Sequence, residues 1–179
     1  MIEKTFWGRI PIERAFSFLY FNKAGLTQNL LHQLKYKGNE DLGNFLGVLY
    51  GQKIKETVEN HKIDAIVAVP LHTSKLRKRG YNQSLAFANG LSESLSIDNF
   101  SSLIVRNKAT ETQTKKNRLE RWQNVESIFS VKEPEKLKNK HLLLVDDVIT
   151  TGATLESCAN AIRKQSDCLL SIASIAYAN

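Results

Sequence analysis

The sequence has almost no cysteine and no long apolar run. Its two cysteines, Cys158 and Cys168, have no second pair, which fits neither a disulfide framework nor a zinc site, so Cys158 is expected to be a small core residue on a helix. No stretch approaches the roughly 18 uninterrupted apolar residues of a membrane span, and the first residues lack the basic-then-apolar order of a secretory signal. We therefore expect a cytoplasmic protein with no membrane partner.

The sequence also lacks internal repeats and low-complexity linkers, as expected for one domain. Its 179 residues, 42% hydrophobic and 24% charged, are typical of a soluble globular protein that can bury a core without disulfides or metal. A formal charge of +7 predicts an anionic partner, such as a nucleic acid or a phosphorylated metabolite. The charge alone is also compatible with no specific partner. The oligomeric state is open, with a homodimer as one option.

Two helices are predicted in the first third of the chain. Leucines recur at helical spacing over residues 26–37, and Gly38 ends that pattern with the basic sequence LKYKG. A longer helix is predicted from about residue 41 to residue 60, with its apolar side formed by Leu42, Phe45, Leu46, Leu49 and Val58. Gly43, Gly47 and Gly51 recur every fourth residue. Because charges flank them, they predict close packing of a second backbone rather than a membrane dimer.

The rest of the chain alternates between predicted strands and helices. Strands are predicted at 63–70, 102–105, 141–147 and 169–178, and helices at 83–95 and 153–164. This alternation indicates the α/β class with a mainly parallel sheet.

Polar segments follow three of these strands, at 70–83, 106–124 and 146–154. In an open parallel sheet a ligand binds beyond the carboxyl ends of the strands, so the three segments should converge on one crevice. The interval from Asn107 to Asn124 is long and polar, which is typical of a lid or binding loop.

The third segment is the most specific. Asp146 and Asp147 repel each other at the end of a strand unless a positive or hydrogen-bond-donating group compensates them. Small and hydroxylated residues then lead into a helix, whose free N–H groups can bind phosphate: Thr150, Thr151, Gly152, Ala153 and Thr154. Together these features indicate a sugar phosphate. The alternative, a polar turn with Thr150 as a simple N-cap, explains one hydroxyl but not the acidic pair.

The stretch LLLVDDVITTGAT, residues 142–154, resembles the phosphoribosyl pyrophosphate (PRPP) motif of the type I phosphoribosyltransferases. Segments 30–38 and 69–84 extend the resemblance over nearly the whole chain to the competence-protein-F-like (ComF/GntX) branch, together with the spaced set Arg106, Thr112, Gln113, Arg118, Arg121 and Asn124. The resemblance implies the type I phosphoribosyltransferase fold, a mainly parallel central sheet flanked by helices with a small N-terminal hood. Residues 1–60 would form the hood region and residues 61–179 the PRPP-binding core of a single domain.

One feature of that family is missing. The family opens with a four-cysteine zinc ribbon, whereas this sequence has no CxxC, so no zinc is expected. The sequence begins where such a ribbon would have just ended, which favours a truncation, an alternative start or loss of the ribbon.

The resemblance also implies roles for individual residues. Asp146 and Asp147 would accept hydrogen bonds from the ribose hydroxyls, and the turn from Thr150 to Thr154 would hold the 5′-phosphate. His72, Thr73 and Ser74 would form the pyrophosphate loop. Mg²⁺ would bridge the pyrophosphate and ribose oxygens and touch the aspartates mainly through water, so no direct protein ligand is expected.

The two basic segments, residues 75–80 and 115–121, have two interpretations. They are either a solvated face or, beside a phosphate turn, the groups that bind pyrophosphate or a polyanionic acceptor. The residues assigned to the second interpretation are Arg79, which would act with the two aspartates in catalysis, and Asn82, Gln83, Arg106, Gln113, Arg118 and Arg121. Tyr81 and Trp122, which lie among them, would either stack a base or pack internally.

Three functions remain open on the sequence. The first is a Mg²⁺-dependent phosphoribosyltransferase with an unidentified acceptor. The second is a non-catalytic protein that binds PRPP, a nucleotide or single-stranded DNA in competence, DNA uptake or regulation. The third, a phospho-acceptor receiver domain, is disfavoured because its acidic pair lies early in the domain, whereas here the pair is at position 146 of 179.

Overall fold

A five-stranded, wholly parallel sheet forms the centre of the protein. The computed structural model describes residues 2–21, 25–107 and 128–178. The strand order is β1-β7-β6-β2-β3, with bounds β1 Ala15–Tyr20, β2 Ala65–Ala68, β3 Asp98–Asn99, β6 His141–Ile149 and β7 Leu169–Tyr177. The predicted α/β class and mainly parallel sheet are confirmed.

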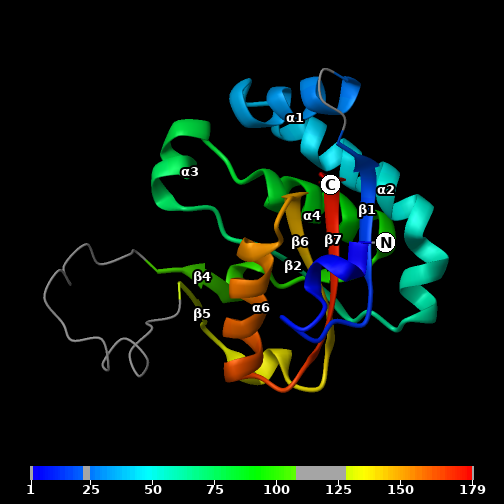
Figure 1. The fold of residues 1–179 in the computed structure, drawn as a ribbon, viewed down its shortest axis with the longest axis vertical. Helices are drawn as coiled ribbons and strands as arrows, with labels where there is room; N and C mark the ends of the chain where they lie inside the picture. Colours follow the sequence, from blue (N-terminus) through cyan, green and yellow to red (C-terminus); the bar gives the residue numbers. More distant parts are fainter. Residues whose placement is uncertain (1, 22–24, 108–127, 179) are drawn as a thin grey trace, which may run out of the picture.

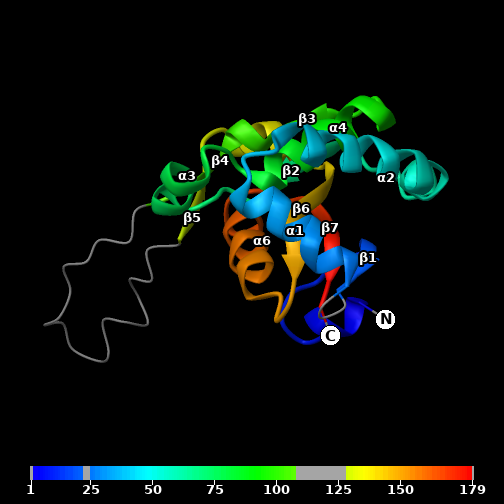
Figure 2. The same ribbon diagram turned by 90° about the horizontal axis from the view of Figure 1, so that it is seen from above.

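Helices cover both faces of this sheet. Figure 2 shows α2 Glu40–Asn60 and α4 Gln83–Leu95 on one face and α6 Ala153–Gln165 on the other. Helix α1 Leu26–Tyr36 packs into the core formed by α2 and α4. A short helix, α3 Thr73–Arg79, projects from the body in both views (Figures 1 and 2). The described residues also form three 3₁₀ turns: η1 Ile2–Phe6, η2 Ser101–Leu103 and η3 Pro134–Leu137.

The strands alternate their side chains between two cores. Along β6, Leu142 and Leu144 pack on the side of α6, whereas Leu143 and Val145 pack on the side of α2 and α4. All four side chains are fully buried. Because successive side chains of a strand point to opposite faces, a continuous apolar run such as LLLV is required where both faces are covered. Cys158 is buried in the α6 core, as predicted.

Two predictions about the sheet were wrong or incomplete. Residues 102–105 do not form a strand of the central sheet, because η2 turns the chain away after β3 and Ser101 Oγ accepts a hydrogen bond from the Ala68 N–H at 2.7 Å. The chain then forms a separate antiparallel ribbon of β4 Ile104–Arg106 and β5 Phe129–Val131. Strand β1 was not predicted, so residues 1–60 contribute one strand to the central sheet in addition to two helices.

The apolar side predicted for α2 was partly wrong. Leu46 and Val58 are buried, but Phe45 is 60% exposed and Leu49 43% exposed. The buried stripe instead contains the glycines, together with Tyr50 and Ile54. The glycine stripe is buried because α4 packs directly on it.

The predicted close packing at the glycines is confirmed. A Cβ atom added at Gly47 would lie 2.2 Å from the Phe87 carbonyl oxygen, and one added at Gly90 would lie 2.0 Å from the Asn44 carbonyl oxygen. The two helices therefore touch through their backbones, which fixes the position of α4 against the sheet. Within the described residues, no helix is both long and apolar enough to cross a membrane.

Gly47→Ala should destabilise the protein more than Gly51→Ala. Alanine gains about 1 kcal/mol of helix propensity at either position, but overpacking costs about 1 to 3 kcal/mol. At Gly47 the new methyl group meets backbone, whereas at Gly51 it meets the Ser94 side chain at 2.8 Å. Urea unfolding of the two variants measures the difference. Equal stability of both would contradict backbone contact between α2 and α4.

Candidate functional site

Two of the three predicted polar segments meet at one edge of the sheet. Strands β2 and β6 are parallel neighbours, so the segments that follow them, 69–83 and 146–154, leave from the same edge. The third segment begins at Arg106, which ends β4 of the antiparallel ribbon and has its guanidinium 5.2 Å from the centre of the Phe129 ring. The other residues predicted in that segment lie outside the described residues: Thr112, Gln113, Arg118, Arg121, Trp122 and Asn124.

The acidic pair lies within β6, which continues to Ile149 rather than ending at Asp147 as predicted, and three groups compensate it. Asp146 Oδ1 accepts hydrogen bonds from Ser84 Oγ at 2.9 Å and from the Asp147 N–H at 2.8 Å. Lys35 Nζ lies 3.3 Å from Asp147 Oδ2, with both side chains mostly buried. Burial and the neighbouring Asp147 carboxylate nevertheless raise the pKa of Asp146 to about 7. Asp146 therefore loses its proton at a higher pH than an isolated aspartate does.

Lys35 and Ser84 could not be assigned from the sequence. The basic end of the first helix was visible, but its pairing with Asp147 depends on how α1 folds over the sheet. Ser84 lies in the first turn of α4, a helix that contacts both α2 and β6. Both are contacts between distant segments, and neither has a local sequence signal.

The turn after the acidic pair is open to solvent. Thr150 and Thr151 are exposed, and Gly152 adopts a φ of +73° at the start of α6. Residues 150–155 enclose a small cavity of about 40 Å³ together with Asp146 and Val148. Gly152 is the N-cap, and the Ala153 N–H donates to Thr151 Oγ1 at 3.4 Å, so the alternative in which Thr150 is a simple N-cap was wrong.

The N-terminal segment, residues 5–9, contacts the turn that precedes α6. Arg9 donates from Nη1 to the Thr151 carbonyl oxygen at 2.6 Å and to the Thr5 carbonyl oxygen at 3.0 Å, and its Nη2 pairs with Glu156. A Cβ atom on Gly152 would lie 2.7 Å from the Phe6 ring. Only glycine combines this contact with a positive φ. Sequence reasoning missed Arg9 and Phe6, since nothing near them marks a link to the turn.

The segment after β2 is shorter than predicted. Residues 72–74 were assigned to a loop, but α3 begins at Thr73, and His72 caps it by accepting from the Ser74 N–H at 3.2 Å. The sequence TSKLRKR is rich in good helix formers, which favours the helix over an open loop. The loop itself is therefore residues 69–72.

The residues after α3 attach this loop to α4. Asn82 donates to the Val69 carbonyl oxygen at 3.0 Å and accepts from the Ser84 N–H at 3.1 Å. Gln83 is only 1% exposed and accepts from Arg79 Nη1 at 2.8 Å. Arg79 and Asn82 thus keep partial access to solvent, whereas Gln83 is buried and positions Arg79.

The carbonyl oxygen of Leu34 links α1 to the residues that follow α3. It accepts hydrogen bonds from Tyr81 Oη at 2.5 Å and from Gln83 Nε2 at 3.4 Å. Lys35, the next residue, contacts Asp147. Tyr81 is 8% exposed, so its ring packs internally, which was one of its two predicted roles.

No protein cage for a metal ion occurs in the described residues. Their His, Cys, Asp and Glu side chains form no group of three or more that could hold a metal. The adjacent carboxylates of Asp146 and Asp147 are hard oxygen donors, and Mg²⁺ is commonly held by one or two carboxylates together with substrate phosphates. The donor set therefore fits a substrate-bridged Mg²⁺ and does not fit a zinc site.

Comparison with known proteins gives consistent results. Residues 50–179 match the family described as "Phosphoribosyl transferase domain". Competence protein F of Haemophilus influenzae is 31% identical over 139 residues, which cover 75% of this chain and 61% of that protein. DNA utilization protein YhgH of Escherichia coli K12 is 31% identical over 136 residues, which cover 74% of this chain and 59% of that protein.

A third relative and one solved structure extend this picture. Competence protein ComFC of Bacillus subtilis is 28% identical over 137 residues, covering 76% of this chain and 53% of that protein. This chain thus spans less than two thirds of these relatives. An allosteric regulatory enzyme of purine biosynthesis superposes with a TM-score of 0.51 at 19% identity, over 73% of this chain and 26% of that one. The predicted type I phosphoribosyltransferase fold and the resemblance to the competence-protein-F branch are confirmed.

The raised pKa of Asp146 predicts how stability depends on pH. The pKa is about 7 in the folded protein against an ordinary 3.8, so between these values the folded state keeps a proton that the unfolded state has lost. The free energy of unfolding should therefore fall as pH rises through this window, by up to about 1.4 kcal/mol per pH unit. Above the folded pKa the loss is complete.

Asp146→Asn should remove this contribution, because asparagine keeps an acceptor for Ser84 but cannot ionise. Urea unfolding at pH 5 and pH 8 should show that the variant gains stability over the wild type mainly at pH 8. Asp98→Asn, which removes an exposed carboxylate from the opposite end of the sheet, is the control and should keep the wild-type dependence. A parallel decline of wild type and Asp146→Asn would show that this carboxyl is not the group responsible.

Proposed function

Since the chain belongs to the phosphoribosyl transferase domain family, we propose that it binds PRPP, or another ligand with a ribose 5-phosphate, at the acidic pair and the turn that follows it. The observation that carries this proposal is the cavity that Asp146 shares with the turn from Thr150 to Thr154. The Asp146 carboxyl group and the first residues of α6 thus line one small space. A ligand that joins hydroxyls to a phosphate satisfies both.

The proposed roles follow from this geometry. The carboxylates of Asp146 and Asp147 accept from the ribose 2′ and 3′ hydroxyls, and the exposed turn holds the 5′-phosphate. Arg9 donates to the Thr151 carbonyl oxygen and so orients the turn. The N–H groups at the start of α6 can then face the ligand. The proton that Asp146 retains near neutral pH reduces repulsion between the acidic pair and the phosphate.

We propose that the bound PRPP undergoes phosphoribosyl transfer. The bond between C1′ and the pyrophosphate oxygen breaks, pyrophosphate leaves with the bonding electrons, and an acceptor forms the new bond to C1′. Residues 69–72 and Arg79 bind the leaving pyrophosphate, because they lie at the neighbouring strand end with a cation beside the loop. Mg²⁺ held near the carboxylates of Asp146 and Asp147 would neutralise further negative charge on the leaving group.

The double variant Asp146→Asn and Asp147→Asn should weaken binding of PRPP with Mg²⁺ by at least about 2 kcal/mol. Hydrogen bonds to charged groups contribute about 1.5 to 3 kcal/mol each, and at pH 8, above the raised pKa of Asp146, the two substitutions remove the charge of both groups. Isothermal titration calorimetry measures the affinity. Glu93→Gln with Asp98→Asn makes the same change in net charge at exposed positions away from the site and should bind as the wild type does. Unchanged PRPP affinity in a folded acidic-pair variant would refute the assignment.

A second candidate function rests on α3. Four of its seven residues are basic, none of the seven is buried, and Lys75, Arg77 and Lys78 form no ion pair with another described residue. A projecting helix of this kind can contact a chain of phosphates. Two of the relatives are named for competence and one for DNA utilization. We therefore propose single-stranded DNA as an alternative partner, bound through α3.

Replacing Lys75, Arg77 and Lys78 by alanine tests this alternative. For single strands, log affinity falls with log salt at about 0.7 per neutralised phosphate, so the triple variant should lower the slope by about 2. Fluorescence anisotropy with a labelled oligonucleotide over a salt series gives the slope. Replacing the exposed Lys53, Lys55 and Lys138 instead should leave it unchanged. The same slope in wild type and α3 variant would exclude α3 as the DNA contact.

A further inference from the structure

Two large apolar side chains of α2 face solvent. Phe45 is 60% exposed and Leu49 43% exposed, whereas Leu46 and Tyr50, next to them in the helix, are buried in the core shared with α4. Helix α2 lies at the outer side of the body in both views, opposite α3 (Figures 1 and 2). Exposed apolar residues that adjoin one another, rather than single ones, indicate a contact surface.

A charged residue continues this pair at each end. Residues 41, 45, 49 and 53 are spaced by four, so their side chains form one of the i±4 ridges through which helices pack. Asp41 and Lys53, the two ends, are exposed. The α2 ridge, defined as these four residues, is thus acidic at one end, apolar in the middle and basic at the other end.

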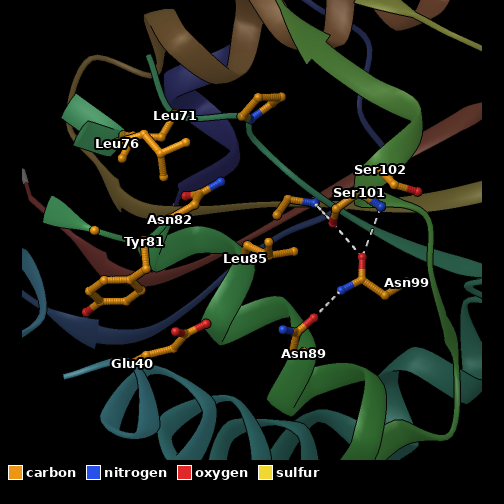
Figure 3. Close-up of a pocket in the computed structure, with 13 residues that line it drawn as sticks. Glu40, Leu71, Leu76, Tyr81, Asn82, Leu85, Asn89, Asn99, Ser101 and Ser102 are labelled. Carbon is orange, nitrogen blue, oxygen red and sulfur yellow. Dashed lines mark hydrogen bonds between the residues drawn. The ribbon is translucent and has the colours of Figure 1, made fainter. Parts of the chain in front are cut away.

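The second acidic residue at the start of α2 belongs to a different face of the helix. Glu40 lines the cavity that residues of α3 and α4 also line, where Figure 3 shows it beside Tyr81. Asp41 lies about 100° further round the helix, since an α-helix has 3.6 residues per turn. Asp41 is therefore the acidic end of the ridge.

The α2 ridge is complementary to itself when two copies lie antiparallel. In a two-fold contact, residue i meets residue j and residue j meets residue i. With the axis level with Gly47, Asp41 faces Lys53 of the second copy and Phe45 faces its Leu49. A parallel arrangement would place like charges together. The ridge carries no net charge, so the formal charge of +7 of the chain does not oppose contact here.

We propose that α2 binds a second copy of this chain, as an antiparallel helix pair about a two-fold axis. Burial of Phe45 and Leu49 supplies the affinity, because removing apolar surface from water is the main favourable term in association. Asp41 and Lys53 set the direction and register, since ion pairs at the rim contribute little affinity. One helix pair is a small interface, so we expect a weak dimer with a dissociation constant of about 50 μM.

The pairing leaves α3 free, because α3 lies on the opposite side of the body from α2 (Figure 1). Contact of α3 with an oligonucleotide and contact of α2 with a second copy are therefore independent. A substitution of Lys53 affects the second contact and not the first.

Sedimentation equilibrium of the full chain, from about tenfold below to about tenfold above the expected dissociation constant, tests the proposal. We expect a monomer–dimer equilibrium. Phe45→Ser and Leu49→Ser should each weaken it by at least about tenfold, because a symmetric interface loses each apolar contact twice. Leu169→Ser, at a leucine of β7 that is 50% exposed, is the matched control and should dimerise as the wild type does.

A charge exchange tests the antiparallel register. Asp41→Lys places lysine opposite Lys53, and Lys53→Asp places aspartate opposite Asp41, so each should weaken the dimer by about fivefold. The chain that carries both substitutions should regain the wild-type dissociation constant, which loss of helix stability alone would not produce. Three results would overturn the proposal: a monomer at the highest concentration, wild-type dimerisation of both serine variants, or no recovery in the chain with exchanged charges.

Discussion

The repulsion between the adjacent carboxyl groups of Asp146 and Asp147 is the constraint on which the site depends. Two adjacent buried acids are stable only if other groups offset their charge, and here these groups come from distant parts of the chain. Lys35 reaches Asp147 from α1, and Ser84 reaches Asp146 from α4. The pKa of Asp146 stays raised despite these contacts, so they do not fully offset its burial and the neighbouring Asp147 carboxylate. That balance leaves it able to accept new partners from a ligand.

The packing of the helices supplies this compensation. The glycine stripe of α2 lets α4 approach through its backbone, which places Ser84 beside Asp146. The same end of α4 carries Asn82, whose amide holds the loop after β2. The N-terminal segment supports the remaining part of the site, because Arg9 and Phe6 hold the turn before α6 from below. The site is thus built from four separate segments: the N-terminal segment, α1, the loop after β2 with the start of α4, and β6 with the turn that follows it.

The sequence predicted the parts of this structure that depend on local pattern. The run LLLV before the acids required a strand covered on both faces, and the recurring glycines required a close helix contact. Both are confirmed. The strand at 102–105 was misplaced because its apolar residues fit a ribbon as well as a sheet, and only the bond from Ala68 to Ser101 decides between them. Lys35 and Arg9 were missed because their partners are fixed only in the folded chain.

The central claim is that the acidic pair and the turn after it form one site for a ribose 5-phosphate. The most direct measurement is chemical-shift mapping of the ¹⁵N-labelled chain with ribose 5-phosphate and Mg²⁺. The account predicts that the amide signals of residues 150–154 move to saturation together with those of Asp146 and Asp147, while those of α3 stay in place. Unmoved signals at residues 150–154 in a folded protein at saturating ligand concentration would contradict it.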